Sequence, residues 1–413
     1  MNDLLEDRLA GTLAERAANV ATAPGRGADE VIARGRRVRH HRRAAVIAAT
    51  AVLAFSAGGV ALQLQRGAGR ATAGPDVTAS AARTKPASAN SVMQGLGFDL
   101  TDAGHGRIVT AGGKQIDIQF PYPGTIGAAT RVPGGWVVEA GTQVGVPVLL
   151  FVTPDGQARV IAVYDKSGSY AVSPDGRTLI VTQVYGDQGT GTPITIAVVF
   201  DLPSLQRVAA LTGPTDVGAW IDVSVKGIYG DLALMTAEGG YVTGVWDYMH
   251  TAVPTLVVNV QSTLAMSDSG QVLYVEGDPD QLNTSGSTCL SVRPISQLQL
   301  GGAPKTCVPG YADSAAMSPD GSVVFVDGVG MFAGADLVAG DAKPAPLARG
   351  FEHYGLGHGH GRVWTADGRI MLERVVGEKP DYTWAACGVD GRCTPAPGPD
   401  GVKSPVPAAN RGA

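Results

Sequence analysis

Residues 171–181 read AVSPDGRTLIV, and this pattern of a polar corner followed by β-branched and apolar residues returns along the chain. Close copies are AMSDSGQVLYV at 265–275 and AMSPDGSVVFV at 316–326, and RVPGGWVVEA at 131–140 is a related stretch. In such a corner proline presets φ, aspartate bonds to its own backbone, and glycine takes a positive φ. The pattern therefore predicts a tight turn that leads into a buried strand.

Six such corners align on their last glycine, and they repeat at blade-like intervals. They are VPGG at 132–135, SPDG at 173–176, SVKG at 224–227, SDSG at 267–270, SPDG at 318–321 and TADG at 365–368. The intervals between the glycines are 41, 51, 43, 51 and 47 residues. Their mean of about 47 residues is typical of a β-propeller blade. One interval holds RTLIVTQVYGDQ, TPITIAVVFDLPS and LQRVAALTG, enough for the four strands of a blade.

These repeats predict an all-β chain whose main domain is a propeller spanning 91–396. GRIVTAGG and KQIDIQF at 106–120 add at least two strands before the first corner. Six complete units and this partial one predict seven blades, with a terminal strand helping to close the ring, and six blades is the alternative. A β-sandwich fits less well, because two sheets do not require a four-strand period repeated six times.

The segment before the propeller has the features of a membrane anchor. Residues 44–62, AAVIAATAVLAFSAGGVAL, carry no charge, and as a helix they would span about 29 Å, close to the hydrocarbon thickness of a bilayer. Residues 34–43, RGRRVRHHRR, contain six Arg and no acid. Because Arg resists translocation, we expect a single-pass protein with a cytoplasmic N-terminus and an extracytoplasmic propeller. A cleaved signal peptide ending near 71–73 is the alternative.

The remaining regions follow from this topology. Residues 1–43 are predicted to form a cytoplasmic head, 63–90 a flexible stalk and 397–413 a disordered tail. The stalk is expected to be flexible because 66–90 has no Leu, Ile or aromatic residue with which to build a core. The predicted partners are the lipid bilayer and an envelope protein or small ligand on the propeller. The Arg cluster adjoins the apolar segment, so we expect no nucleic-acid partner.

The head itself has one helical pattern. Its apolar positions recur at helical spacing after Asn2, which is placed to cap the helix; they are Leu5, Leu9, Leu13, Ala17 and Val20. A free helix of this length is marginal in water. The sequence therefore predicts either a helix completed by a cytoplasmic partner or a frayed helix near the membrane.

Four cysteines lie in the predicted propeller, and their spacing favours local disulfides. Cys387 and Cys393 flank GVDGR, a tight-turn sequence, while Cys289 and Cys307 bracket a stretch that reads as two strands around a turn. Opposed residues of a hairpin lie within disulfide reach. Three pairings are open, of which Cys289–Cys307 with Cys387–Cys393 is the local one. Zinc is disfavoured because no Cys-x₂-Cys pair is present, and buried free thiols are the other interpretation.

We also expect the Cys387–Cys393 bond to lie in the blade that closes the ring. On the sequence alone, this closing blade has no covalent link to the first blade, and its seam would be the weak point of the propeller.

A search for catalytic motifs finds none, and no catalytic residue, cofactor or metal site is predicted. His-Glu-x-x-His, G-x-S-x-G and phosphate-loop patterns are all missing from the sequence. FEHYGLGHGHG at 351–361 places His353, His358 and His360 close together as ligand candidates, although an exposed glycine-rich loop explains them as well. Trp136, Trp220, Trp364 and Trp384 are predicted to pack between blades.

SPDGRTLIV and its copies resemble the repeats of TolB-like and WD-repeat-like propellers. The whole chain, with its DLLEDRLAGTLAERA head, Arg cluster and Ala-rich segment, resembles actinobacterial single-pass proteins found near extracytoplasmic-function sigma factors. Trp246-Asp247 is a single Trp-Asp pair, unlike the repeated pair of true WD repeats. The resemblance implies a propeller fold and supplies no catalytic residues.

The sequence favours a non-enzymatic module that binds or senses a ligand or a protein outside the membrane. One alternative is an anti-sigma-like regulator acting through 1–43, although this head lacks the His-x₃-Cys-x₂-Cys pattern of zinc anti-sigma domains. The second alternative is a propeller hydrolase or lactonase, which would gather acids or histidines at the mouth of the ring.

Overall fold

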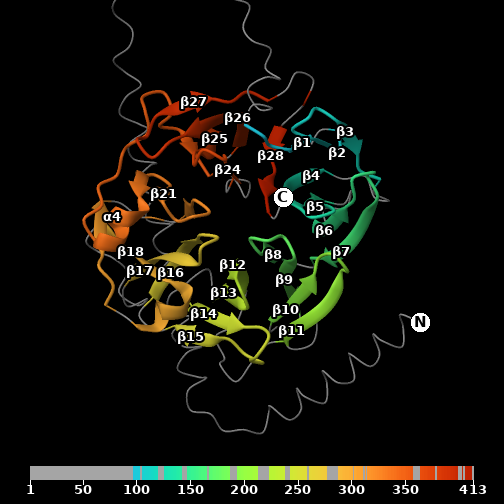
Figure 1. The fold of residues 1–413 in the computed structure, drawn as a ribbon, viewed down its shortest axis with the longest axis horizontal. Coiled ribbons are helices and arrows are strands. Elements are labelled where there is room, and N and C mark those ends of the chain that lie inside the picture. Colours follow the sequence, from blue (N-terminus) through green and yellow to red (C-terminus); the bar gives the residue numbers. More distant parts are fainter. Residues whose placement is uncertain are drawn as a thin grey trace, which may run out of the picture. The chain divides into compact units, whose positions relative to one another are not determined.

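The fold is a seven-bladed β-propeller (Figure 1). The computed structural model describes residues 96–411 except 103–104, 120–124, 142–146, 165–166, 187–192, 213–222, 238–241, 258–259, 277–286, 301, 310–311, 313, 357–362, 377–378, 399–401 and 403–404. The head, membrane segment and stalk predicted for 1–43, 44–62 and 63–90 lie outside these residues. No helix of the described part has the length and apolar character needed to cross a bilayer.

Blades 1 and 2 contain the two ends of the ring. Blade 1 orders its strands as β28 (Pro405–Pro407), β1 (Leu100–Asp102), β2 (Arg107–Val109) and β3 (Gln115–Asp117). Blade 2 orders them as β29 (Ala409–Asn410), β4 (Ile126–Val132), β5 (Gly135–Gly141), β6 (Pro147–Val152) and β7 (Ala158–Val163). In both blades the first-listed strand lies nearest the centre of the ring (Figure 1).

Blades 3 to 5 are regular four-stranded meanders. Blade 3 has β8 (Ser167–Val172), β9 (Thr178–Gly186), β10 (Pro193–Asp201) and β11 (Gln206–Thr212). Blade 4 has β12 (Ser224–Tyr229), β13 (Leu232–Ala237), β14 (Val242–Asp247) and β15 (Thr255–Val257). Blade 5 has β16 (Val260–Met266), β17 (Gln271–Glu276), β18 (Ser287–Pro294), the 3₁₀ helix η2 (Ile295–Leu300) and β19 (Thr306–Pro309).

Blades 6 and 7 depart from the regular pattern. Blade 6 has β20 (Ala315–Met317), β21 (Val323–Val326), β22 (Gly330–Ala333) and the helix α4 (Gly334–Ala339), with a bridge from Met331 to Ala345 at its outer edge. Blade 7 has β23 (Tyr354–Gly355), β24 (Val363–Trp364), β25 (Ile370–Val376), β26 (Lys379–Cys387) and β27 (Cys393–Pro395). Both β23 and β24 pair with β25, so they share the innermost position of this blade.

The second strands of the blades are the predicted buried runs. Leu179, Ile180 and Val181 in β9 are at most 1% exposed, and Val324 and Phe325 in β21 are equally inaccessible. Each such strand is covered by the neighbouring blades on both faces, which explains its continuous apolar sequence. Apolar clusters accordingly join consecutive blades, so that the ring forms one cooperative core.

Four of the six predicted corners join the first two strands of a blade as expected, and two need correction. In VPGG the left-handed residue is Gly134, with φ 85°, because Gly135 already begins β5. In SVKG the glycine Gly227 lies within β12 opposite Leu234, and the corner is formed by Gly230, with φ 54°. Gly227 has a packing role instead, since a Cβ there would meet the Met266 methyl group at 2.7 Å.

The end of the chain closes the ring, which corrects two sequence predictions. The sequence predicts a disordered tail at 397–413, but Pro405–Pro407 forms the innermost strand of blade 1 and pairs with β1. The Trp384 indole N–H of blade 7 donates to the Pro405 carbonyl at 2.7 Å. Because the chain runs from β27 of blade 7 to β28 of blade 1, these two blades are covalently linked. The non-covalent seam of the ring is the pairing of β28 with β1. The predicted terminal strand that helps to close the ring is confirmed.

Candidate functional site

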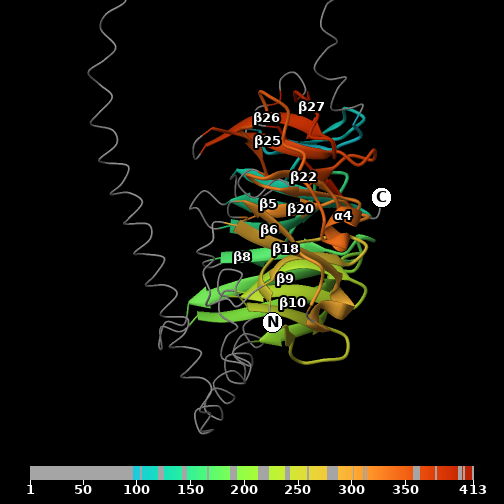
Figure 2. The ribbon, with the colours of Figure 1, turned by 90° about the vertical axis from the view of Figure 1, so that its left-hand side faces the viewer.

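The propeller has two faces that differ in the connections they carry. Because neighbouring strands are antiparallel, the turns between first and second strands lie on the same face as those between third and fourth strands. We call this side the turn face. The loop face carries the connections between second and third strands and those from one blade to the next. Figure 2 shows the ring edge-on between these two faces.

On the turn face the corners are braced by hydroxyl–carboxylate hydrogen bonds. In blade 6 the Ser318 hydroxyl donates to Asp320 at 2.6 Å, and it also accepts from the Val323 N–H at 2.9 Å. The Ser318 hydrogen bond holds the pKa of the Asp320 carboxyl below its usual value. Thr365 holds the pKa of Asp367 low in the same way at the blade 7 corner. These carboxylates therefore serve the turns themselves, which is a structural role.

A shallow, open pocket lies on the turn face between blades 2 and 3. Its lining residues come from a corner of each blade and from the β10–β11 turn, and they are Pro133, Asp175, Arg177, Asp201 and Pro203. Asp201 accepts hydrogen bonds from Ser204, and the Arg177 N–H donates to Asp175 at 3.0 Å. The lining thus offers charge but contains no histidine, cysteine or hydroxyl nucleophile.

The predicted histidine ligands are not brought together by the described structure. His353 is exposed in the connection leading to blade 7, and His358 and His360 lie outside the described residues. The described residues contain no group of three or more His, Cys, Asp or Glu side chains that would hold a metal ion. On either side of 357–362, the chain belongs to the innermost strands of blade 7, where Gly355 pairs with Glu373 and Val363 pairs with Met371.

Two histidine–aspartate pairs were missed by the sequence analysis. On the loop face the His105 Nδ1 lies 2.8 Å from Asp102 Oδ2, and Arg107 Nε donates to the same oxygen at 3.0 Å. Asp102 is fully buried while the His105 side chain is 39% exposed, so the imidazole is held in place and open to solvent. His250 and Asp247 repeat the pairing on the turn face. The shared Asp-x-x-His spacing is the sequence signal that could have found both pairs.

A partly buried carboxyl lies between blades 2 and 3 toward the loop face. Burial raises the pKa of Glu139 on β5, and it also raises the pKa of the neighbouring phenols of Tyr164 and Tyr170. Tyr170 lies 3.3 Å from the Thr130 hydroxyl across the blade interface. The Tyr164 hydroxyl is buried without a hydrogen-bond partner among the described residues. Glu139 is thus ionised at a cost to folding, in contrast to the carboxylates of the turn face.

The tryptophans occupy the predicted packing positions where the structure describes them. Trp136 is 5% exposed and donates to Asp99 of blade 1 at 2.8 Å, while Trp384 is 1% exposed at the ring closure. Trp364 is partly buried against the blade 6–7 cluster. Trp220 lies outside the described residues.

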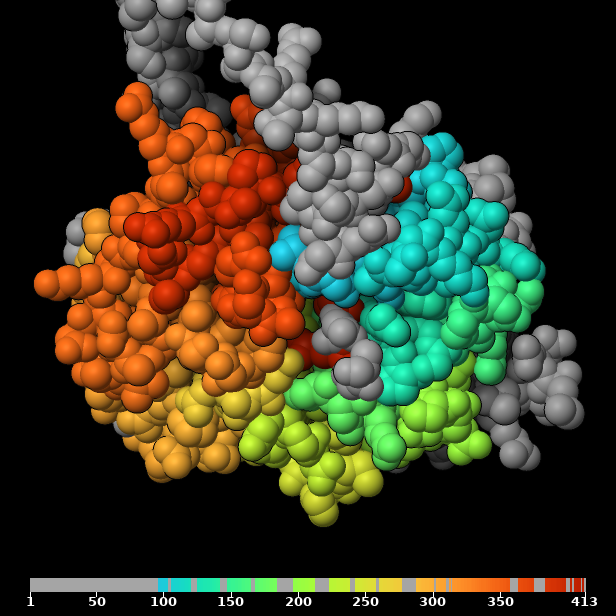
Figure 3. Space-filling model, turned by 45° about the horizontal axis from the view of Figure 1, so that its top comes forward, coloured from blue at the N-terminus to red at the C-terminus, as the bar shows by residue number. Residues whose placement is uncertain are grey.

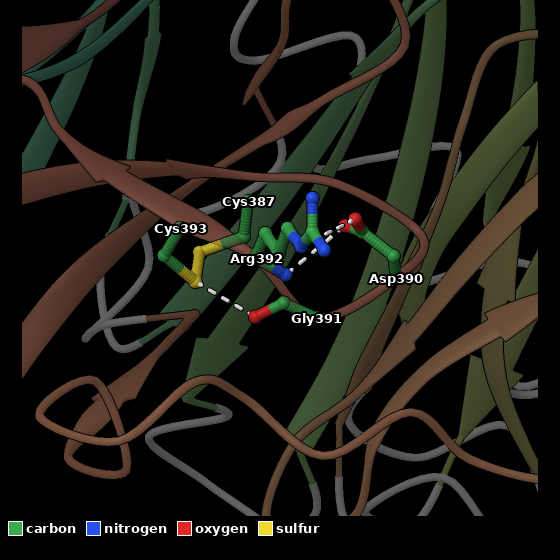
Figure 4. Close-up of a disulfide and its surroundings, with 5 residues drawn as sticks. All are labelled: Cys387, Asp390, Gly391, Arg392 and Cys393. Carbon is green, nitrogen blue, oxygen red and sulfur yellow. Dashed lines mark hydrogen bonds and ion pairs between the residues drawn. A yellow bond between two sulfur atoms is a disulfide. The ribbon is translucent and has the colours of Figure 1, made fainter.

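Both predicted disulfides are present in the structure. Cys289–Cys307 joins β18 and β19 of blade 5, with the Cα atoms 3.9 Å apart, and Cys387–Cys393 joins β26 and β27 of blade 7 at 4.0 Å. Each bond links residues directly opposite one another on antiparallel strands. Figure 4 shows the blade 7 bond beside its hairpin turn, where the Arg392 N–H donates to Asp390 at 3.0 Å. No cysteine is left free.

The two disulfides lie toward opposite faces. Cys387 ends β26 at the turn face, whereas Cys289 lies near the start of β18, just after the connection 277–286 on the loop face. The blade 5 bond therefore fixes the base of a loop-face connection to the outer strand of its blade.

Comparison with known proteins finds distant similarities to solved structures alone. No family model and no curated protein matches the chain. Among solved structures, TolB from Acinetobacter baumannii is 14% identical with a TM-score of 0.39, covering 76% of this chain and 66% of that chain. The acylaminoacyl peptidase of Pyrococcus horikoshii is 12% identical with a TM-score of 0.45, covering 71% and 48%. The C-terminal WD40 domain of Sif2 is 14% identical with a TM-score of 0.38, covering 64% and 71%. The chain thus spans less than two thirds of TolB and of the peptidase.

Proposed function

We propose that this chain is a membrane-anchored, extracytoplasmic propeller that binds or senses a ligand or an envelope protein through its loop face without catalysing a reaction. The observation that carries the proposal is the pair of in-register disulfides. All four cysteines are consumed in two cross-strand bonds within single blades. Such bonds persist in an oxidising compartment and are rare in the cytosol.

Anchoring follows from combining that compartment with the N-terminal sequence. The uncharged segment 44–62 is followed by the propeller and preceded by six Arg within 34–43. The Arg cluster favours a cytoplasmic N-terminus, which places the disulfide-bonded propeller on the other side of the bilayer. The proposal is consistent with disulfides in the propeller and with the absence of any cysteine before residue 289.

The loop face is the side we assign to binding. β11 and β17 end on this side and β12 and β18 begin there, in blades 3 to 5, which are neighbours in the ring. Connections on a rigid scaffold commonly carry binding residues. The described strand ends beneath them are firmly held, because Cys289–Cys307 locks β18 and the Ser169 hydroxyl of blade 3 accepts from the Val225 N–H of blade 4 at 2.9 Å.

Topology is tested by labelling a single introduced thiol in intact cells. Leu300 is 71% exposed on η2, so Leu300→Cys offers a thiol while the four native cysteines stay bonded. A membrane-impermeant maleimide is expected to label Leu300→Cys in intact cells. The control Ala10→Cys, in the head, is expected to react only after lysis. Labelling of Ala10→Cys and protection of Leu300→Cys in intact cells would overturn the proposed orientation.

Binding is tested by crosslinking on the intact membrane protein. A photo-crosslinking residue at Thr284, in the loop-face connection 277–286, is expected to capture the same species in repeated experiments. A matched probe at Val389, an exposed turn-face residue, is expected not to capture it. A hydrolase would instead retain metal or turn over esters or lactones, so stoichiometric metal in the purified chain that is lost in His358→Ala would contradict the non-enzymatic proposal.

A further inference from the structure

The last described residues bind to a place that ring closure does not require. After β28, the chain leaves blade 1 and runs parallel to the inner edge of β4, with Ala409 opposite Thr130 and Asn410 opposite Arg131. The Arg411 N–H donates to the Arg131 carbonyl at 2.9 Å. Blade 2 therefore gains a fifth strand through main-chain hydrogen bonds, which any extended peptide can supply.

The carbonyl of Arg411 rests against the corner of blade 3. A Cβ on Gly176 would lie 2.7 Å from the Arg411 oxygen and 2.5 Å from the Pro133 ring. This close approach is possible because position 176 is glycine, with φ 70°. The corner thus leaves room for the backbone of residue 411 to pack directly against it.

The Arg411 side chain reaches the opposite side of the ring. Its guanidinium forms an ion pair with Asp268, in the blade 5 corner, and the two side chains are 27% and 24% exposed. Blades 2 and 5 face each other across the centre of the ring (Figure 1). In Figure 3 the red C-terminal residues are seen within the central hollow. The arginine is therefore recognised by a carboxylate that lies away from the strand it extends.

The strand that closes the ring and the segment that follows it differ in burial. Val406 is 1% exposed and packs with the blade 1 and blade 7 core, and Ala408 is 2% exposed. Ala409 and Arg411 are only partly buried. Ala409 and Arg411 are thus less buried than the strand that closes the ring.

We propose that the β4 edge at Thr130–Arg131, the Gly176 corner and Asp268 form a docking groove, the axial groove, for an extended partner segment in which small residues precede an arginine. Residues 409–411 are its tethered occupant. The proposal goes beyond binding through the loop face, since it assigns a second site on the opposite face. A tethered occupant competes at an effective concentration in the millimolar range, so a partner segment must bind more tightly or be held close by.

The experiment empties the groove and refills it in trans. The full chain, purified in detergent and ended after Ala408, keeps β28 and the Ala408 hydrogen bond to Asp99. A labelled peptide Ala-Asn-Arg-Gly-Ala, matching 409–413, is expected to bind this variant saturably with a Kd of about 0.1 mM or below, because a tethered copy at millimolar effective concentration then fills the site. The untruncated chain is expected to bind it at least about tenfold more weakly through competition.

Charge variants test the recognition of the arginine. Asp268→Asn in the truncated chain is expected to weaken binding of the peptide about fivefold. Asp367→Asn, at an equivalent corner that does not contact Arg411, is expected to leave the peptide affinity unchanged. Asp268→Arg is expected to lose the arginine peptide and to bind its Arg→Glu counterpart. Should the truncated chain not fold, full-length Arg411→Glu serves as the acceptor. Failure of a folded acceptor to bind the peptide, or equal binding by Asp268→Asn, would overturn the proposal.

Discussion

The carboxyl groups at the turn-face corners of this propeller and the carboxyl group between blades 2 and 3 lie in opposite electrostatic surroundings. On the turn face, hydroxyl and backbone donors lower the pKa of Asp320 and Asp367, so these groups are stabilised as carboxylates. Toward the loop face, burial raises the pKa of Glu139 between two blades. Asp320 and Asp367 therefore help to hold their corners together, whereas the charge of Glu139 is unfavourable to folding.

The largest expected effect is on the strand that closes the ring beneath the turn face. Val406→Asp places an unpaired charge in the core around Trp384, and should cost about 4 kcal/mol or more in the free energy of unfolding. Val389→Asp, at a 42% exposed turn position, should change it by less than about 0.5 kcal/mol. Urea unfolding followed by tryptophan fluorescence measures both. Similar stabilities for the two variants would mean that β28 does not close the ring.

Removal of the disulfides has the next largest expected effect on stability, and one bond lies toward each face. Removing Cys289–Cys307, which closes a longer loop, should cost about 3 kcal/mol, and removing Cys387–Cys393 about 2–3 kcal/mol, by loop entropy. The blade 7 bond precedes the closing strand, so Cys387→Ser with Cys393→Ser should speed proteolysis near the C-terminus more than the blade 5 pair does. Mass spectrometry of limited digests compares them. Faster C-terminal cleavage in the blade 5 variant would contradict the assignment of the seam.

Two corner glycines on the turn face distinguish the cost of a positive φ from the cost of a steric clash. Gly176→Ala should cost about 2 kcal/mol or more, because it adds a clash with Pro133 and Arg411 to the penalty for a positive φ. Gly368→Ala has a similar φ of 78° with nothing near its Cβ, and should cost about 1 kcal/mol. Thermal unfolding of the two variants gives the difference. Equal costs would show that Gly176 does not support the C-terminal segment.

The smallest expected effects on stability come from substitutions of Glu139 and Asp320, and they have opposite signs. The pKa of Glu139 is raised in the folded chain, so its ionisation destabilises the fold above that pKa and has no cost below the unfolded value near 4.5. Glu139→Gln should therefore stabilise the chain at pH 8, and the gain should vanish at pH 4. Asp320 has a lowered pKa and contributes stability above its unfolded value near 3.8, which is lost as the pH falls further. Asp320→Asn should thus destabilise the chain at pH 8. Urea titrations at both pH values test this, and a destabilising Glu139→Gln at pH 8 would remove the contrast.

Local chemistry explains how much of this molecule could be predicted. The Ser-Pro-Asp-Gly corners and the apolar runs after them encode the blade in consecutive residues, and the cysteine pairs lie on single hairpins, so fold and disulfides followed from short-range rules. The corner of blade 4 was misplaced because GIYG offers two glycines, and only the backbone angle distinguishes Gly227 from Gly230.

Long-range pairing explains what could not be predicted. Pro405-Val406-Pro407 has the composition of a disordered tail, yet it pairs with a strand 305 residues away, where an innermost position tolerates proline. The fixed orientation of His105 likewise depends on Asp102 being buried within the first blade. The axial groove has no local signature either, because its residues come from blades 2, 3 and 5.

The central claim, an exported and disulfide-bonded propeller, is tested most directly by trapping thiols in living cells. Cells that express the native chain are quenched in acid and alkylated under denaturing conditions, with and without prior reduction, and the mass of the chain is measured. We expect no alkylated cysteine without reduction and four after it, matching the two bonds that use every cysteine of the sequence. Four alkylated cysteines without reduction would show that the propeller folds in a reducing compartment, and would contradict both its export and the function proposed for it.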